Sequence, residues 1–484
     1  MGDGETKHFE RKQALYKSLD EKYLVHGQKY KGQQYSQIYF ARLHRVRNLL
    51  NSLVHKWKPH LPGLLRGKNG LIKCTHYLKN HLRGSHWLQG FFLEILMSLK
   101  RSLILKPNLK VLGLEEGKEC IIVGTIYKHM KLKPSILCEY SKERSMVPLV
   151  KPHNFVHSDD YLILEDEIGR VRLRGCSLIA VDFVTGTGLA LHGMKTNEGD
   201  FLVQDFLEAG LPPQMKLPIH WREDKYVVFV SGLNVGGNKF NPLQFQLLID
   251  HLTGLLGGEN DYKTASNIVR LVIAGSSILI PQSILNGQTL ALDDQSKLTE
   301  PIKELDILLT QLAVAMPLDI MPGPSDPANS FLPQQPLHRC LFPGASAYST
   351  FFCCTNPHHF ELDGVQFIGT SGQNIDDLDK YSIGKDKLEF IERTLRWRHL
   401  APTAPNTLGC YPFTEKDPFF LESCPHVYYV GNQEKFETRL LQGPENHLVR
   451  LICIPRFCES GVAVMLNLKN LECHTLCLST DLNS

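Results

Sequence analysis

The chain has 484 residues, of which 43% are hydrophobic and 21% charged, and its formal net charge is +3. This length favours two or three domains, and this composition excludes a disordered or fibrous protein. No window is apolar for the about 18 residues that a membrane span needs, and the polar start MGDGETKHFERKQ is not a signal peptide.

The charge is unevenly distributed along the chain. Residues 41–110 contain 14 Lys and Arg against one acid, Glu94, so they carry +13 and the remainder carries −10. An acidic body disfavours direct DNA binding by the main domains, because such binding depends on phosphate neutralisation. The 13 cysteines are an odd number without framework spacing, which indicates reduced thiols and an intracellular protein.

The first predicted element is an N-terminal helical segment, residues 1–62. Between Glu10 and Leu50, charged residues are interleaved with apolar residues at helical spacing, and prolines near residue 60 end the pattern. A basic insertion, residues 63–110, follows. It contains four possible zinc ligands, Cys74, His76, His81 and His86. Their spacing fits no standard zinc finger, so a solvated insertion is the preferred interpretation.

Residues 111–213 have the pattern of a β domain. Five short β-branched runs, separated by turn residues, read CIIVGTIY, YLILEDE, GRVRLRG, TGTGLALHG and DFLVQDF. Five such strands predict a small closed barrel of the OB type. These barrels often bind single strands through aromatic platforms and a basic groove, but few exposed aromatics are expected here, and Glu165, Asp166 and Glu167 lie in one strand. A protein-docking barrel is favoured, and nucleic-acid binding stays open.

Residues 214–484 alternate between strand and helix patterns. The run YVVFV leads into a glycine-bearing loop and an amphipathic run, Leu243 to Leu256. This alternation predicts parallel strands with right-handed crossovers. The later runs GVQFIGT, HVYYVG, LVRLICIP and AVMLNL predict a second sheet packed on the first. The loop after the first strand is not a P-loop, because its order is Gly237-Asn238-Lys239-Phe240.

The loops after the strands of this region resemble those of the calcineurin-like metallophosphoesterases in spacing and order. That family uses D-x-H, G-D-x-x-D, G-N-H-D/E and G-H-x-H to hold two metal ions that activate a water. Asp326 alone remains as a plausible ligand, and one carboxylate cannot hold two divalent ions. We therefore expect no catalytic, cofactor-binding or metal-binding residues. The degenerate ligand positions are Ser231, Leu233, Ser276, Pro324, Ser325, Asp326 and Asn432.

An OB barrel joined to a phosphoesterase domain without its ligands resembles the second, B-type accessory subunits of the replicative DNA polymerases, of the polymerase delta type. The resemblance covers residues 32–61 and 111–484. Its most specific stretches are VSGLNVGG, DIMPGPSDPAN, LPQQPLH, GTSGQN, RHLAPTAPNTLGCYPF and CPHVYYVGN. The predicted fold is thus α/β and β: an N-terminal helical segment, an OB-type β-barrel, and a two-sheet α/β metallophosphoesterase-like domain at residues 214–484 without its metal ligands.

The resemblance implies a non-catalytic scaffold in the nucleus. Its partners would be the C-terminal metal-binding region of the polymerase delta catalytic subunit and the clamp-associated third subunit, with DNA and the sliding clamp reached through the complex. The chain itself would need no cofactor, because zinc and the iron–sulfur cluster belong to the partner. Two alternatives stay open. One is a single-stranded DNA-binding protein, and the other is an active metal-dependent phosphoesterase with unrecognised ligands such as His358, His359, His399 and His426.

Overall fold

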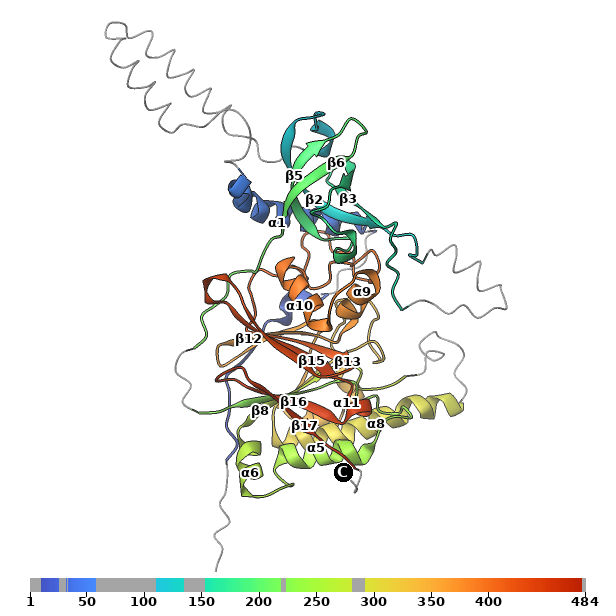
Figure 1. The fold of residues 1–484 in the computed structure, drawn as a ribbon. Coiled ribbons are helices and arrows are strands. Elements are labelled where there is room, and N and C mark those ends of the chain that lie inside the picture. The colour runs from blue at the N-terminus through green and yellow to red at the C-terminus, as the bar shows by residue number, and fades with distance from the viewer. Residues whose placement is uncertain are drawn as a thin grey trace, which may run out of the picture. The chain divides into compact units, whose positions relative to one another are not determined.

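The computed structural model describes residues 10–25, 32, 34–57, 110–134, 153–218, 223–280 and 292–480. Contacts divide the chain into two compact units (Figure 1). The barrel unit comprises Tyr39–Met146 and Val156–Ala209, and the sandwich unit comprises Met1–Ile38, Val147–Phe155 and Gly210–Ser484. Residues 63–109 of the predicted insertion, with its four possible zinc ligands, lie outside the described residues.

Five strands of the barrel unit form a closed barrel in the order β2–β3–β4–β6–β5. Their bounds are Glu119–His129 (β2), Tyr161–Glu165 (β3), Arg170–Arg174 (β4), Gly188–Lys195 (β5) and Phe201–Leu207 (β6). Strict alternation places Val171 and Leu173 of β4 inside the barrel and its arginines outside. Since β2 pairs with both β3 and β5, the sheet closes on itself, and the predicted barrel is confirmed.

The helix α1 (Ser36–Leu53) and the turn η2 (Val54–Trp57) contribute to the barrel unit. A Cβ atom at Gly188 of β5 would lie 2.5 Å from Val46 Cγ1, so the helix approaches the strand at a point that requires glycine. Trp57 Nε1 donates a hydrogen bond to Asp205 Oδ2 at 2.7 Å. The second half of the predicted N-terminal helical pattern is therefore a helix, and it packs on the barrel.

The first half of that helical pattern is not a helix. Tyr16–Ser18 form the strand β1, which pairs antiparallel with β11 (His358–Leu362), and Asp20–Tyr23 form the 3-10 turn η1. Leu15 is 78% exposed, so the apolar spacing here does not correspond to a buried helical face. Hydrogen bonds to the edge of a sheet outweigh a weak local helix preference. Residues 10–25 are called the N-terminal strap below.

The first sheet of the sandwich unit has the order β10–β9–β8–β7–β16–β17. Its strands are β7 (Tyr226–Val230), β8 (Ile268–Ala274), β9 (Leu318–Met321), β10 (Phe351–Cys353), β16 (Val462–Asn467) and β17 (Cys473–Cys477). The strands β7 to β10 are parallel, as the alternation of strands and helices predicts. The assignment of AVMLNL to the second sheet was wrong, because β16 pairs antiparallel with β7.

The second sheet has the order β1–β11–β12–β13–β15–β14. Its other strands are β12 (Val365–Thr370), β13 (Val427–Gln433), β14 (Glu437–Gln442) and β15 (Leu448–Pro455). One apolar core lies between the two sheets, where the rings of Phe229 and Tyr429 are 4.8 Å apart. A second core lies between the first sheet and its helices.

Helices cover the outer faces of both sheets (Figure 1). The helices α5 (Pro242–Thr253), α6 (Glu259–Ser266) and α8 (Leu292–Ala315) lie on the first sheet, and α9 (Gln373–Tyr381) and α10 (Lys387–Arg396) lie on the second. The short helix α11 (Phe457–Ser460) joins β15 to β16. This four-layer arrangement is the predicted two-sheet α/β domain, and it brings the strand ends of both sheets together.

Candidate functional site

The loops that carry the degenerate ligand positions meet at one end of the two sheets. Ser231 follows β7, Ser276 follows β8, Asp326 follows β9, and Asn432 lies near the end of β13. A backbone hydrogen bond of 2.9 Å joins the loop after β7 to the loop after β8. The fold therefore brings these loops together at one end of the two sheets.

Ser231 and Asn432 connect the two sheets. Ser231 Oγ lies 3.1 Å from Pro455 O, and it accepts a hydrogen bond of 2.8 Å from Asn432 N. Asn432 Nδ2 donates to Ser371 O at 2.8 Å. Both side chains are buried. Their hydrogen-bonding atoms hold one loop to another, where a phosphoesterase would present metal ligands.

The next three positions offer almost no ligand atoms. Leu233 is fully buried and packs in the core between the first sheet and its helices. Pro324 and Ser325 line a pocket of about 970 Å³ beside the loops. Leucine and proline side chains carry no donor atom for a metal, so Ser325 is the single possible ligand of the three, and hydroxyl groups bind divalent ions weakly without carboxylate partners.

Glycines allow the backbones of the loops to approach one another closely. A Cβ atom at Gly323 would lie 2.3 Å from Ser276 N, and one at Gly431 would lie 2.2 Å from Ala274 O. Real Cβ atoms do not approach backbone so closely, so these positions accept only glycine without displacement of a loop. The loops after β8, β9 and β13 are thus packed directly against one another.

Asp326 is the remaining candidate ligand, and its carboxylate accepts backbone hydrogen bonds. Ile278 N donates to Oδ1 at 2.8 Å, and Gly323 N donates to Oδ2 at 2.7 Å. Burial raises the pKa of Asp326 to about 7, against the opposite effect of these amides. A buried carboxylate whose two oxygens both accept backbone hydrogen bonds is a poor ligand for a cation. These residues do not fit a two-metal centre.

The glycine-rich loop after β7 offers no phosphate site either. Lys239 Nζ pairs with Glu459 Oε1 at 2.6 Å, and Asn241 Oδ1 accepts hydrogen bonds from the first amides of α5. A helix N-terminus binds an anion through its free N–H groups, and here a side chain of the chain itself caps them. The structure supports the sequence interpretation of a structural loop.

The four histidines named as alternative ligands are held by separate partners. His399 Nε2 lies 2.7 Å from Asp417, and His426 Nε2 lies 2.8 Å from Met215 O. His358 lies 2.7 Å from Asp20, and burial lowers the pKa of its neighbour His359 to about 3. These contacts give no common centre for the four rings, so the alternative phosphoesterase site has no geometric support in the described residues.

Comparison with known proteins places the chain in a family. The domain family described as DNA polymerase delta subunit OB-fold domain matches residues 34–206, and the family of the B-type subunits of DNA polymerases alpha and epsilon matches residues 227–438. A DNA polymerase delta small subunit of Oryza sativa subsp. japonica is 63% identical over 475 residues, which cover 98% of this chain and 100% of that protein. The chain belongs to the family of DNA polymerase delta small subunits.

Other members of the DNA polymerase delta small subunit family show how far the similarity extends. The Arabidopsis thaliana protein is 59% identical over 481 residues, which cover 99% of both chains. The Saccharomyces cerevisiae protein is 34% identical over 429 residues, which cover 81% of this chain and 84% of that one. The predicted family resemblance is confirmed. No helix in the described parts of the chain is long and apolar enough to cross a membrane.

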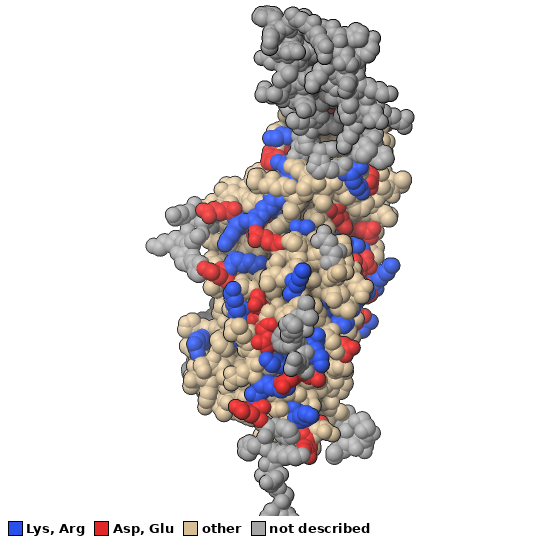
Figure 2. Space-filling view, turned by 90° about the vertical axis from the view of Figure 1, so that its left-hand side faces the viewer, with Lys and Arg blue, Asp and Glu red and all other residues tan. Residues whose placement is uncertain are grey.

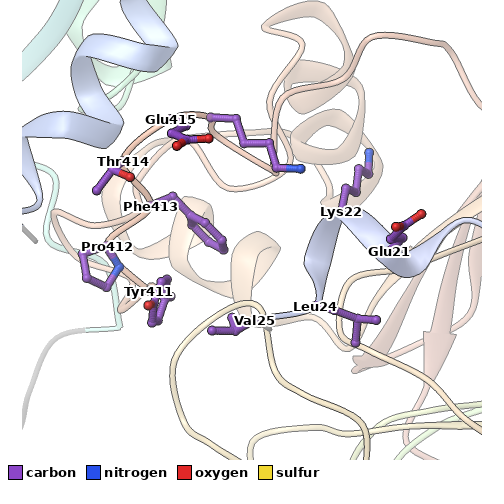
Figure 3. A pocket seen from close by; sticks show the side chains of 10 residues that line it. Glu21, Lys22, Leu24, Val25, Tyr411, Pro412, Phe413, Thr414 and Glu415 are labelled. Atoms are coloured by element: carbon purple, nitrogen blue, oxygen red, sulfur yellow. The ribbon is translucent and has the colours of Figure 1, made fainter. Parts of the chain in front are cut away.

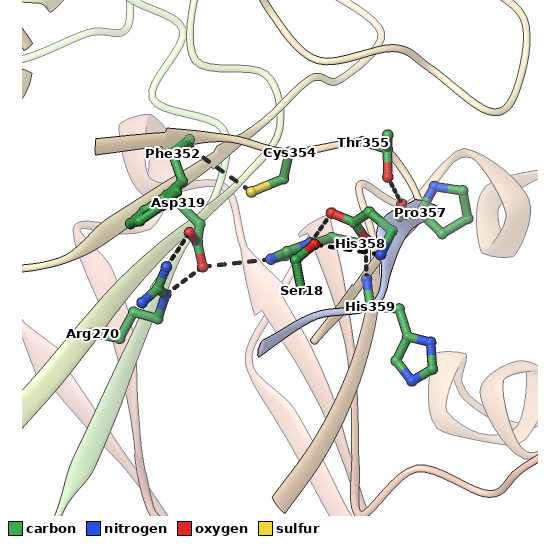
Figure 4. Close-up of polar contacts among 10 residues, drawn as sticks. Ser18, Arg270, Asp319, Phe352, Cys354, Thr355, Pro357, His358 and His359 are labelled. Carbon is green, nitrogen blue, oxygen red and sulfur yellow. Dashed lines mark hydrogen bonds and ion pairs between the residues drawn. The ribbon is translucent and has the colours of Figure 1, made fainter. Parts of the chain in front are cut away.

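A buried group of charged side chains lies between the two sheets (Figure 4). Arg270 of β8 contacts Asp319 of β9 through two hydrogen bonds of 2.6 and 2.7 Å. His358 of β11 lies 3.4 Å from Asp319 through Nε2 and 2.7 Å from Asp20 of the strap through Nδ1. We call Asp20, Arg270, Asp319 and His358 the buried clasp, because it ties the strap to both sheets.

The clasp shares Asp20 and His358 with the one possible metal-ligand group among the described residues, whose third member is Cys354. Asp20 Oδ2 is hydrogen-bonded to His358, and Oδ1 accepts from His359 N at 2.6 Å. Burial raises the pKa of Cys354 to about 12, so its sulfur is a neutral thiol. The Asp20 carboxylate and the His358 ring are hydrogen-bonded to each other, so these two groups are already paired and do not fit a metal ion.

Sequence reasoning missed the clasp, although a signal was present. Arg270 interrupts the apolar run IVRLVIA, and Asp319 interrupts LDIM, and both side chains are buried. A charged residue inside a buried strand is rare unless a partner neutralises it. Such interruptions could have predicted an ion pair between neighbouring strands. They could not have predicted that the strap would supply Asp20.

Raising the pH above neutrality is expected to loosen the strap. Burial lowers the pKa of His358, but the neighbouring Asp20 carboxylate outweighs this effect, and the pKa lies well above 6.5. A histidine whose pKa is raised on folding stabilises the folded state fully when the pH is below its pKa in the unfolded chain. This stabilisation is lost as the pH rises through its pKa in the folded chain. Hydrogen exchange of the β1 amides, corrected for intrinsic rates, should therefore accelerate at alkaline pH. Equal acceleration in the control strand β14 would contradict this.

Proposed function

We propose that this chain is a non-catalytic accessory subunit of a DNA polymerase delta complex, acting in the nucleus in DNA replication and repair synthesis. It would link the C-terminal region of the catalytic subunit to the clamp-associated third subunit. Family membership supports the complex, since the relatives are named as small subunits of this polymerase. The observation that carries the non-catalytic part is that Asp326, the last candidate ligand, accepts backbone hydrogen bonds on both carboxylate oxygens.

The absence of catalysis has a chemical reason and a direct test. A two-metal hydrolase depends on a metal-bound hydroxide and on charge stabilisation by both ions, so loss of most ligands abolishes turnover. We expect the purified chain to contain no stoichiometric manganese, zinc or iron and to hydrolyse neither phosphodiesters nor single-stranded DNA ends. Metal-dependent hydrolysis that disappeared in Asp326→Ala would overturn the proposal and establish an enzyme.

The barrel unit is proposed to dock the clamp-associated subunit. Its described surface exposes large apolar side chains on loops that flank β4, namely Ile168 (50% exposed) and Ile179 (56% exposed). We propose that these two side chains belong to a surface that the partner covers. The catalytic subunit would then bind to the sandwich unit.

Double substitution of Ile168 and Ile179 by Ser is expected to reduce the affinity for the clamp-associated subunit roughly tenfold or more, because each apolar side chain loses its partner contacts. Capture of the catalytic subunit should be unchanged. The matched control is Leu243→Ser, an exposed leucine (59%) on α5 of the sandwich unit. Co-expression followed by affinity purification measures the capture of each partner subunit. Loss of both partners from a chain that still folds would show that the surfaces are misassigned.

A second candidate function, single-strand binding by the barrel, is favoured by one observation. The rings of His129 and Tyr161 stack at 4.6 Å, and the Arg172 guanidinium lies 4.2 Å from the centre of the Tyr161 ring. Stacked aromatics and arginine are used by single-strand binders. However, Arg170 is paired with Glu165, and positive and negative side chains are interspersed over the face shown in Figure 2. Salt-dependent binding of oligonucleotides to the wild type, lost in Tyr161→Ala, would favour this candidate.

A further inference from the structure

A pocket of about 410 Å³ lies within the sandwich unit, away from the closed loops. One wall is formed by Glu21, Lys22, Leu24 and Val25 of the strap, and the other by the loop of residues 411–416. Figure 3 shows the two walls facing each other, with the Phe413 ring directed from the loop toward the strap. We call this the strap pocket. Its volume falls in the range of roughly 300–1,000 Å³ that is usual for ligand sites.

Both walls of the strap pocket are held in place. Val25 N donates to Gln335 Oε1 at 3.0 Å, and Gln335 Nε2 donates to the carbonyl of Tyr23 at 3.1 Å. On the other wall, Tyr411 N donates to Leu332 O at 2.8 Å, and the rings of Tyr411 and Phe413 pack edge to face at 5.1 Å. The buried clasp fixes the strap itself. A pocket with both walls fixed binds without the entropy cost of ordering them.

The interior combines an apolar surface with an unfavourably placed cation. Leu24, Val25 and the two aromatic rings supply the apolar part. Burial lowers the pKa of Lys22 to about 8, and Lys416 adds to this effect, although the Glu422 and Asp20 carboxylates oppose it. Two ammonium groups at one pocket repel each other, so an additional carboxylate there would lower the free energy of both.

The ring of Tyr411 contributes to the apolar wall of the pocket, whereas its hydroxyl oxygen is buried and does not open into it. The pocket thus presents ammonium groups next to an apolar surface.

We propose that the strap pocket binds a segment of a partner protein in which a carboxylate stands next to an aromatic or large aliphatic side chain. The carboxylate contacts the Lys22 ammonium, and the apolar side chain packs on Phe413. Glu21 and Glu415 at the exposed edge disfavour a nucleic acid, whose continuous phosphates they would repel. The proposal rests on the proposed function, since the partner is taken to be another subunit of the complex.

The first test uses the full-length chain and an array of overlapping 15-residue peptides that span the other polymerase delta subunits. We expect binding to be confined to peptides with adjacent acidic and apolar residues. Lys22→Met and Phe413→Ala should each weaken the binding by roughly tenfold or more, measured by fluorescence anisotropy. The matched controls are Lys469→Met and Tyr262→Ala, an exposed lysine and an exposed tyrosine outside the pocket, and they should change it less than twofold.

The second test uses the assembled complex. Competitive amine labelling, read by mass spectrometry, compares Lys22 in the free chain and in the complex. With a pKa near 8, Lys22 should react readily in the free chain and at least fivefold more slowly in the complex, where a carboxylate stabilises its charge. Equal reactivity in both, or peptide binding that is indifferent to Lys22→Met and Phe413→Ala, overturns the strap-pocket proposal. Failure of the complex to assemble at all would instead overturn the proposed function.

Discussion

Replacement of Asp319 by Asn is expected to lower the unfolding free energy by about 3–5 kcal/mol, because it leaves the Arg270 guanidinium buried without its counter-charge. Asp319 is fully buried. Although burial raises the pKa of its carboxyl, Arg270 outweighs this, and the pKa lies below the ordinary value of 3.8. Both residues of the ion pair are therefore charged at neutral pH. Because both are buried, the residue that remains after the substitution cannot be solvated by water.

Denaturant titration, together with hydrogen exchange of the β8 and β9 amides, measures the loss. The control is Glu459→Gln, which removes an exposed partner of Lys239 and should cost less than about 1 kcal/mol. The combined variant Arg270→Met with Asp319→Leu should recover much of the stability, since an apolar pair of similar volume often replaces a buried ion pair. A loss below about 1 kcal/mol for Asp319→Asn would show that the clasp does not stabilise the fold.

Asp326→Ala is expected to destabilise the sandwich unit by about 3 kcal/mol or more. The carboxylate accepts hydrogen bonds from backbone amides of two loops, those of Ile278 and Gly323 among them. Each buried amide left without an acceptor costs about 1–3 kcal/mol. The residue that looks like the last metal ligand thus has a structural role, as the acceptor that holds the loops after β8 and β9 together.

The Asp326 variants separate this role from catalysis. Asp326→Asn keeps one acceptor oxygen and should lose less stability than Asp326→Ala, as measured by thermal and denaturant unfolding. DNA synthesis by an assembled polymerase should follow the folded fraction of this chain and show no further loss. A fully stable Asp326→Ala chain would contradict the loop-closing role, and a synthesis defect in a fully folded variant would indicate a chemical role.

Part of this architecture could be predicted from local sequence alone. The period-two alternation of β4 and the continuous apolar run of β7 determine which faces are buried, because strand side chains alternate and parallel strands are covered on both sides. The absence of metal ligands can also be read from individual residues. Leu233 and Pro324 have no metal-binding atoms in any conformation, so the sequence by itself excluded their family roles.

The tertiary structure alone decided the remaining features. The strap has an apolar spacing that fits a helix, yet β1 pairs with β11, because the hydrogen bonds that the sheet edge offers come from residues far along the chain and leave no local pattern. Likewise, β16 belongs to the first sheet because it pairs with β7, a strand that lies far from it in the sequence. The clasp required charged side chains from four separate segments to meet, and the strap pocket required two. Distances between such segments follow from packing, whereas periodicity within one segment determines only which of its faces is buried.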